Sequence, residues 1–419
     1  MATMTSQRAK QVQFALMAVF FTQGILGTAM IPRVPDLIER LDVSFAAWGT
    51  ILGLAGLGSL LGLSVSNRII TRFGSRNVIR VTSVILSLML ISYAWTENPI
   101  VFFALFFVNN FAGGFFNIAV NAQTVVLQKI MNKPIIGSFH ASWSVGATIT
   151  AAVSGVLAAT TELWVHFLIL GGVALISYLF FGRLILGEHE DEKHTSAKHG
   201  KKIPFFKSPP QVWLLAAGLF AGVFAEVALI DWSAILARDG FLLGPAIASI
   251  PYTVFAGAMI VGRLSIDRLT RVYHISTLSY WGGIIGGSSL LLGVFAAANI
   301  GQTNPYLAML TASFFFAIAG LGTAPMVPSF FSGAGHVRGL TTAQTMARMS
   351  LVSQVTMLLA KIGMGAAVEA ATIVFAFIIP AGMLITSGIL AGFVVRNSKR
   401  SEAVANAFPP TGPITTISD

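Results

Sequence analysis

Three ionisable side chains lie inside long apolar stretches of this 419-residue chain, namely Glu226, Asp231 and Lys361. If those stretches cross a bilayer, each charge costs at least about 2.5 kcal/mol and usually serves a function. A carboxylate in apolar surroundings takes up a proton more readily than one in water. Glu226 lies about 14 residues into its stretch, roughly 21 Å along a helix, so we predict that it carries a proton. The alternative is a structural glutamate paired with Lys361 or hydrogen-bonded to the backbone.

Asp231 and Lys361 are weaker candidates for chemistry. Asp231 follows Glu226 by five residues, which turns a helix by about 500° and places the two carboxylates on different faces. We expect Asp231 near the outer end of its helix, where it joins the proton-coupling group, gates that side or is simply solvated. Lys361 either binds an anionic substrate, pairs with Glu226, or extends along the helix to the membrane surface.

A row of amide side chains marks a second candidate site. Asn110, Gly114, Asn117 and Asn121 are spaced 4, 3 and 4 residues apart, which places them on one helix face. Amides both donate and accept hydrogen bonds, as a hydroxyl-rich or zwitterionic solute requires. We predict that Asn110, Asn117, Asn121 and Gln23 bind substrate, although membrane asparagines also join helices to one another.

The elements that position these residues are predicted to be membrane-spanning helices. The chain is 55% hydrophobic and only 10% charged, whereas soluble domains carry about 25% charged residues. An all-α membrane protein with twelve transmembrane helices follows, because each apolar run is long enough to cross a bilayer. The predicted runs are 12–31, 46–66, 77–95, 99–127, 136–158, 163–186, 212–236, 242–265, 275–297, 305–332, 341–368 and 371–395.

A polar stretch divides these runs into six and six. We predict an N-terminal six-helix bundle over 1–186, a cytoplasmic linker over 187–211, a C-terminal six-helix bundle over 212–400 and a cytoplasmic tail over 401–419. The net charge of +10 orients the chain, since 22 of its 26 Lys and Arg residues fall in segments on one side. Cytoplasmic loops carry such an excess, so both termini are predicted to be cytoplasmic. The positive charge is therefore explained by the orientation of the chain in a lipid bilayer, and we expect no nucleic-acid partner.

The two halves also repeat a short motif. Gly62-Leu-Ser-Val-Ser-Asn67-Arg68 recurs 200 residues later as Gly262-Arg-Leu-Ser-Ile-Asp267-Arg268. With the twelve runs and the central linker, this repeat resembles the major facilitator superfamily over essentially the whole chain. The resemblance implies two pseudo-symmetric bundles with a substrate site between them at mid-membrane. In the first half, Thr71-Arg72-Phe73-Gly74-Ser75-Arg76 lacks the aspartate that this family usually has before its arginine.

Several strings resemble, more narrowly, a bacterial branch near the fucose-permease-like transporters. They include Pro32-Arg33-Val34-Pro35, Asn117-Ile-Ala-Val-Asn121-Ala, Ser138-Phe-His140-Ala-Ser-Trp143-Ser and Asp231-Trp232-Ser233. This resemblance implies a multi-pass protein of the bacterial plasma (inner) membrane. The charged residues of the repeated loops are predicted to gate the cytoplasmic side by pairing with acidic residues at helix ends, or else only to set topology. They are Arg68, Arg72, Arg76, Arg263, Asp267 and Arg268.

The sequence excludes several classes of catalyst. It has no Cys and no P-loop or HExxH motif, so thiolate chemistry, an ATP-driven pump and a metalloprotease are not expected. The linker histidines His189, His194 and His199 are too sparse for a metal site, and we expect no cofactor and no enzyme activity. The favoured function is a monomeric, proton-coupled secondary transporter that moves a small polar, sugar-like solute by alternating access. A proton-antiporting efflux pump for amphipathic drugs is the alternative, because the chain holds 32 Phe and 14 Met.

Overall fold

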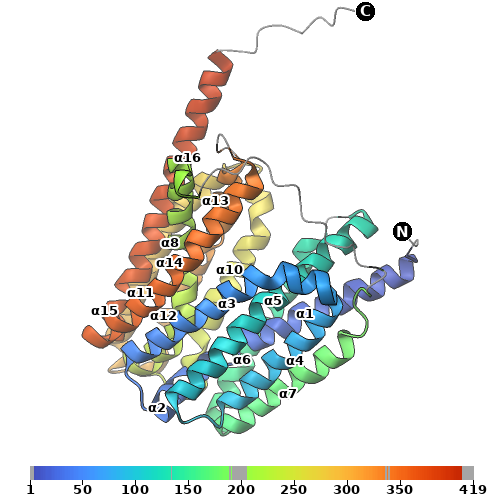
Figure 1. Cartoon of the computed structure of the whole chain (residues 1–419). Coiled ribbons are helices and arrows are strands. Elements are labelled where there is room, and N and C mark those ends of the chain that lie inside the picture. Colours follow the sequence, from blue (N-terminus) through green and yellow to red (C-terminus); the bar gives the residue numbers. More distant parts are fainter. Residues whose placement is uncertain are drawn as a thin grey trace, which may run out of the picture.

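The computed structural model is built from helices throughout the part of the chain that it describes, residues 4–133, 135–187, 190, 205–335, 337 and 340–407 (Figure 1). Twelve of its helical segments are long and apolar enough to span a membrane, which confirms the predicted fold class. The linker histidines and most of the predicted linker and tail lie outside the described residues.

The N-terminal helices are α1 (Ser6–Thr28), η1 (Ile31–Arg33), α2 (Val34–Arg40), α3 (Phe45–Phe73), α4 (Ser75–Tyr93), α5 (Pro99–Met131), α6 (Ile136–Thr160) and α7 (Leu163–Phe181). The later ones are η2 (Phe205–Lys207), α8 (Pro210–Ile235), η3 (Leu236–Gly240), α9 (Pro245–Ala248), α10 (Ile250–Leu269), α11 (Ile275–Gly301), α12 (Pro305–Thr323), α13 (Met326–Ala334), α14 (Thr342–Ala370), α15 (Ile373–Ala376) and α16 (Ile378–Ala407).

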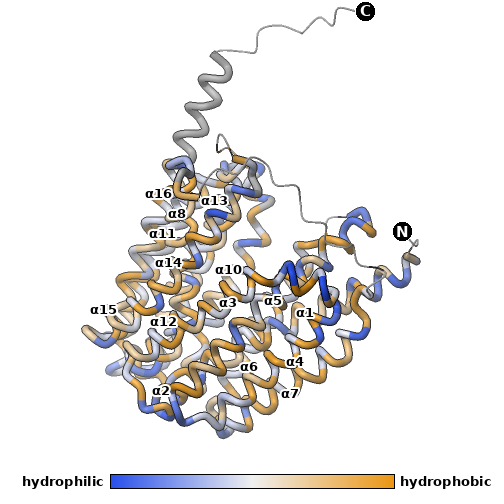
Figure 2. The backbone as a smooth tube through the Cα atoms, in the orientation of Figure 1, coloured by the Kyte–Doolittle hydropathy of each residue, from blue (hydrophilic) through white to orange (hydrophobic). Residues whose placement is uncertain are grey.

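The helices form two bundles with the same internal arrangement. In the first bundle α1 packs on α6 and α7, α5 packs on α3 and α4, and α4 packs on α7. The second bundle repeats each of these contacts, with α8 on α14 and α16, α12 on α10 and α11, and α11 on α16. Figure 2 shows hydrophobic residues along the lengths of the helices and hydrophilic ones mainly near their ends. The sequence repeat is therefore matched by a structural one.

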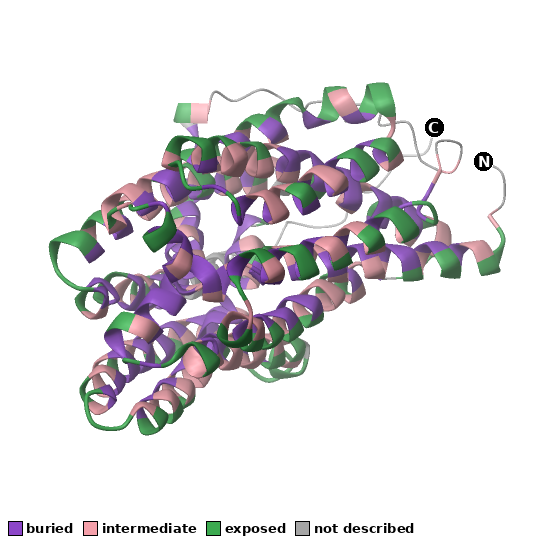
Figure 3. Cartoon of the chain, turned by 90° about the horizontal axis from the view of Figure 1, so that it is seen from below, coloured by how far each residue is buried: buried purple, intermediate pink, exposed green. Residues whose placement is uncertain are grey.

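Glycines allow the helices of each bundle to cross closely. A Cβ built on Gly24 of α1 would lie 2.2 Å from the carbonyl oxygen of Trp143 in α6, and one on Gly283 of α11 would lie 2.5 Å from the Cα of Gly388 in α16. Such contacts exclude any larger residue, as expected where packing joins membrane helices. Buried residues accordingly follow the faces that helices turn toward each other (Figure 3).

The two bundles meet at one end of the molecule, which we call the closed end. There α3 packs against α14, and a Cβ on Gly49 would lie 2.7 Å from the Cα of Gly365. The backbone N–H of Phe45 donates to Glu369 Oε2 at 2.9 Å, and Arg238 pairs with Glu39 across the same boundary. Toward the other end, where α1 begins and α16 ends, the bundles spread apart (Figure 1). We call this the termini end.

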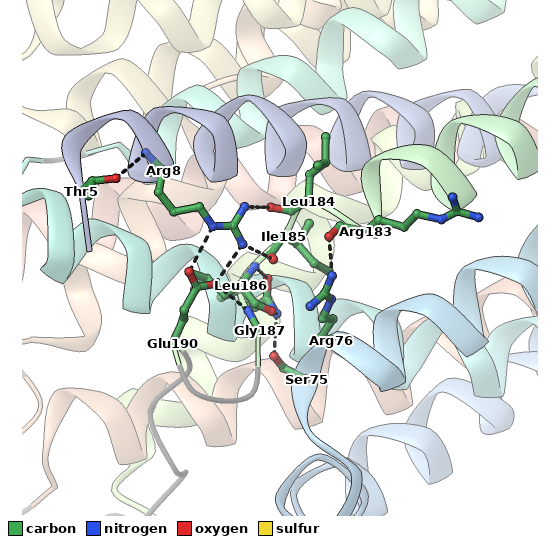
Figure 4. Close-up of polar contacts among 11 residues, drawn as sticks. Thr5, Arg8, Ser75, Arg76, Arg183, Leu184, Ile185, Leu186, Gly187 and Glu190 are labelled. Carbon is green, nitrogen blue, oxygen red and sulfur yellow. Dashed lines mark hydrogen bonds and ion pairs between the residues drawn. The ribbon is translucent and has the colours of Figure 1, made fainter. Parts of the chain in front are cut away.

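At the termini end, the segment that follows α7 is fixed to the first bundle (Figure 4). Arg8 donates to the carbonyl oxygens of Leu184 and Ile185 at 2.8 and 3.0 Å, and it pairs with Glu190 at 2.9 Å. Gln123 of α5 donates to the carbonyl of Leu186 and accepts from its N–H. The start of the linker is therefore held by side chains from α1 and α5.

Arg8→Gln is expected to release this segment. The hydrogen bond from Arg8 holds the pKa of Glu190 below its ordinary value of 4.5, so their ion pair persists above that pH and is lost as the pH falls through the lowered pKa. Protection of a peptide covering 182–187 against hydrogen exchange, relative to the intrinsic rate at each pH, should be severalfold lower in the variant, and also in wild type once the pH is low enough to protonate Glu190. Lys10→Gln, an exposed change two residues further along α1 and about 200° around the helix, should leave the exchange unchanged. Equal protection in wild type and Arg8→Gln would refute this role.

Candidate functional site

A cavity of about 350 Å³ lies between the bundles, next to the closed end. Nearly all of its walls come from α1, η1, α3, α4, α5 and α6, and α8 closes it with Ile230 and Asp231. Its polar lining is dominated by uncharged groups, and Asp231 is the single acidic or basic side chain among its described lining residues. The polar and aromatic residues of the wall are Gln23, Trp48, Ser59, Tyr93, Phe106, Asn109, Asn110, Asn117, Trp143 and Asp231.

The structure brings three of the four predicted amides to this cavity. Gln23, Asn110 and Asn117 line it, and Asn110 also donates to the carbonyl of Phe106 at 2.8 Å. Asn121 lies outside the lining and donates to the carbonyl of Asn117 at 2.8 Å. Gly114, placed in the same row by its spacing, instead packs against α3, where a Cβ would lie 2.8 Å from the carbonyl oxygen of Ser59. The row of polar residues is thus shorter than its spacing indicates.

Sequence reasoning missed several lining residues. Asn109 precedes Gly113 and Asn117 by four and eight residues, and this spacing could have identified it. Trp48 and Tyr93 both pack their rings against Phe102, at centroid distances of 5.5 and 5.1 Å. The indole Nε1 of Trp48 and the hydroxyl of Tyr93 are buried and have no hydrogen-bond partner among the described residues. Nothing in the local sequence singles out these two residues.

Asp231 forms an ion pair at the wall of the cavity. Lys361 Nζ from α14 lies 2.7 Å from Asp231 Oδ2, an atom with no other polar partner in the described residues. Their side chains are only 11% and 21% exposed, for Asp231 and Lys361 respectively. The expectation of a solvated aspartate near the helix end does not match this geometry, because the span of α8 continues through η3 to Gly240. Asp231 consequently lies about 14 Å from the end of that span.

Glu226 has a different partner from the one considered for it. Arg263 of α10 donates to Glu226 Oε2 at 3.0 Å, and the Glu226 side chain is 17% exposed. The alternative pairing of Glu226 with Lys361 is therefore not formed, because Lys361 pairs with Asp231 instead. The two acids of α8 each contact a cation on a separate helix of the same bundle, which keeps this region close to neutral.

Among the side chains that the structure describes, the predicted gating residues form no ion pair between the bundles. Arg263 pairs within its own bundle, and Arg76 donates to the carbonyl of Arg183, also within its own bundle. Arg68, Arg72 and Arg268 are exposed and form no ion pair with any described residue. Asp267 lies in α10, and its side chain is outside the described residues. Among the described residues, the ion pair that crosses between the bundles joins Arg238 to Glu39 and lies at the closed end.

A buried arginine strengthens the first bundle near the closed end. Arg33, 6% exposed, donates through Nε to His166 Nδ1 at 3.0 Å and through Nη1 to Asp36 at 2.6 Å. Its remaining N–H groups reach the carbonyls of Leu157 and Thr161. Because His166 Nδ1 accepts this bond, the imidazole is held neutral with its proton on Nε2, which faces Ser154 at 3.1 Å. The Pro32-Arg33-Val34-Pro35 string thus fixes η1 to α6 and α7.

Twelve spanning helices in two related bundles, enclosing a polar cavity, define a membrane protein of the transporter class. The family model described as Major Facilitator Superfamily matches residues 12–343. The chain therefore belongs to the major facilitator superfamily.

Relatives and solved structures agree with this membership. The chain is 28% identical to the uncharacterized transporter y4wD of Sinorhizobium fredii, over 86% of this chain and 92% of that protein. It is 26% identical to an uncharacterized MFS-type transporter of Yersinia pestis, over 94% of this chain and all of that protein. A mutant of the nucleoside transporter NupG superposes with a TM-score of 0.74 at 14% identity, over 91% of this chain and 99% of NupG. A bacterial homologue of the human lysosomal transporter Spinster, inward-facing and unoccupied, superposes with a TM-score of 0.72 at 15% identity, over 95% of this chain and 99% of that homologue. These structural likenesses show the fold.

Proposed function

We propose that this protein is a proton-coupled secondary transporter that moves a small, uncharged polar solute by alternating access. The observation that carries the proposal is the cavity, whose wall combines amide side chains with Asp231, the partner of Lys361. The arginine-rich loops and the bacterial relatives support placing it in a bacterial plasma membrane with both termini cytoplasmic. The termini end is then the cytoplasmic end, and the closed end faces outward.

The charge of the cavity favours a neutral solute. Lys361 is engaged by Asp231 at 2.7 Å, so the pair presents little net charge to a ligand. The remaining polar groups are amides, a serine and the N–H and O–H donors of aromatic rings. Amides both donate and accept, which matches hydroxyl and carbonyl groups better than a full charge. A neutral, hydroxyl-bearing solute fits these groups. A sugar is such a solute and is what the resemblance to the fucose-permease-like branch implies, and a nucleoside, the substrate class in the name of NupG, is another.

Asp231 is the carboxylate that we propose for proton coupling. It lies in the cavity wall, whereas Glu226 is not among the lining residues. Protonation of Asp231 removes the attraction that holds Lys361, so the proton and the position of α14 relative to α8 are linked. Because α14 also packs on α3 of the other bundle, this link reaches the contact between the bundles. Glu226 with Arg263 forms a second pair through which α8 and α10 respond to a proton.

Efflux of amphipathic compounds remains the alternative because aromatic rings contribute much of the wall. Trp48, Tyr93, Phe106 and Trp143 all line the cavity. A library screen by thermal stabilisation of the purified protein separates the two functions, since only ligands that bind the folded state raise its stability. Stabilisation by neutral polyols, sugars or nucleosides supports the proposal. Stabilisation confined to amphipathic cations and drugs supports efflux and overturns the proposed substrate class.

Asn117→Ala is expected to weaken binding of the solute identified in that screen about tenfold. The substitution removes one or two hydrogen bonds, each with a net value of about 1 kcal/mol, and tenfold corresponds to about 1.4 kcal/mol. Asn121→Ala is the matched control, since this asparagine lies one turn further along α5 and outside the lining. The measurement is the dissociation constant by calorimetry. A loss for Asn121→Ala as large as that for Asn117→Ala would contradict the position of the site.

A further inference from the structure

Two exposed arginines of the first half, Arg68 and Arg72, lie at a groove on the outer surface of the first bundle. The groove has a volume of about 720 Å³ and lies where α3 and α4 run apart over α5. α5 packs closely on both helices, whereas α3 and α4 contact one another far less. Val108, Phe111, Ala112 and Phe115 of α5 form the floor. This surface is separate from the cavity between the bundles.

The walls of the groove are apolar and turn outward. Val65 and Phe73 of α3 and Val81 of α4 line it and are 38%, 50% and 60% exposed. In a membrane-spanning bundle such residues face lipid, so the groove lies alongside acyl chains in the half of the bilayer nearest the termini end. Gly74, with φ of 76°, makes the tight turn between α3 and α4 at that end.

Positive charge is concentrated where the groove reaches the membrane surface. Arg68 lines the groove, and Arg72 follows one helical turn later with its guanidinium 5.3 Å from the centre of the Phe73 ring. Both arginines are exposed and pair with no acidic residue in the described part of the chain. A cation near the surface of a bilayer attracts an anionic headgroup by about 1 kcal/mol. Arginine is also suited to phosphate because its fork of N–H donors matches two phosphate oxygens.

We propose that this groove binds one anionic phospholipid, with an acyl chain between α3 and α4 and its phosphate at Arg68 and Arg72. The apolar floor selects a chain, and the two unpaired cations at its end select a negative headgroup. The role proposed for these arginines is independent of solute transport.

The test uses the purified full-length protein with phosphatidylglycerol and phosphatidylcholine as probes, and native mass spectrometry as readout. We expect wild type to retain phosphatidylglycerol in preference to phosphatidylcholine. The double variant Arg68→Gln/Arg72→Gln should bind phosphatidylglycerol roughly 30-fold more weakly, at about fivefold for each arginine. Arg271→Gln, which removes an exposed cation from the second half, should bind it like wild type.

A second pair of variants tests the groove itself. Val81→Trp fills the groove from α4 and should lower the amount of bound lipid, whereas Leu88→Trp changes an exposed residue of the same helix outside the groove and should not. If the arginine variants fail to fold, a salt titration of wild type tests the proposal instead. Added salt should weaken the binding of phosphatidylglycerol, because salt screens the attraction between its headgroup and exposed cations. Binding that salt leaves unchanged would contradict the proposal. Equal retention of the two lipids, unchanged binding in Arg68→Gln/Arg72→Gln, or a lipid-free dimer in place of bound lipid would each overturn the proposal.

Discussion

Replacing Asp231 by Asn is expected to abolish concentrative uptake while exchange of solute across the membrane continues. The amide preserves the shape of the side chain but cannot carry the proton that drives accumulation. Uptake into proteoliposomes under an imposed proton gradient should then stop at equal concentrations on the two sides. Exchange of labelled for unlabelled solute needs the cavity alone, so it should persist. Accumulation by the variant to the wild-type level would contradict a coupling role for Asp231.

The partner of Asp231 provides the control for folding. Asp231→Asn leaves Lys361 as an unpaired cation that is only 21% exposed, and breaking a buried pair in this way costs about 3 to 5 kcal/mol. The double variant Asp231→Asn/Lys361→Met removes both charges and should recover most of the lost stability. It should still fail to accumulate solute. Recovery of both stability and accumulation in the double variant would mean that the pair is structural.

Glu226→Gln separates the two carboxylates of α8. Its partner Arg263 is 35% exposed and remains partly solvated without it, so the loss of stability should be smaller than for Asp231→Asn. If Glu226→Gln abolishes accumulation and Asp231→Asn does not, the coupling carboxylate is the one that the sequence favoured on grounds of depth. The comparison of the two variants in the same assay therefore decides between them.

The sequence predicts the fold well because the bilayer restricts what a span can be. A run of about 20 apolar residues identifies a helix, and the repeated Gly-to-Arg motif relates the halves. Spacing also predicted that Asn110 and Asn117 share a helix face, and both line the cavity. These features depend on one helix at a time, and the sequence contains them locally.

Pairing between helices could not be predicted in the same way. The sequence shows two acids on one helix and cations on others, but the pairs depend on how each helix is rotated and how far it extends. The extension of the α8 span through η3 places Asp231 deep enough to meet Lys361, and Glu226 meets Arg263 of α10. Trp48 and Tyr93 were missed for the same reason. The local sequence does not distinguish an aromatic residue that packs between helices from one that lines a cavity.

The contact at the closed end gives the test of alternating access with the largest expected effect. Gly365→Leu places a branched side chain where even a Cβ would lie 2.6 Å from the carbonyl oxygen of Phe45 and 2.8 Å from the Cα of Gly49. Neither backbone can yield without separating α3 from α14. The substitution should therefore destabilise the arrangement closed at this end and stop the transport cycle.

The absence of cysteine from the chain makes the change in conformation directly measurable. A single cysteine at Met30, which lines the cavity near the closed end, should react with an impermeant maleimide from the closed side only when that end opens. Overpacking costs of about 1 to 3 kcal/mol imply a rise in labelling of roughly 5- to 150-fold in Gly365→Leu. Gly363→Leu is the matched control, because a Cβ at Gly363 meets no atom within 4 Å. If Gly365→Leu transports and labels like Gly363→Leu, the close crossing of α3 and α14 is not the barrier that seals the cavity, and the bundles must separate elsewhere.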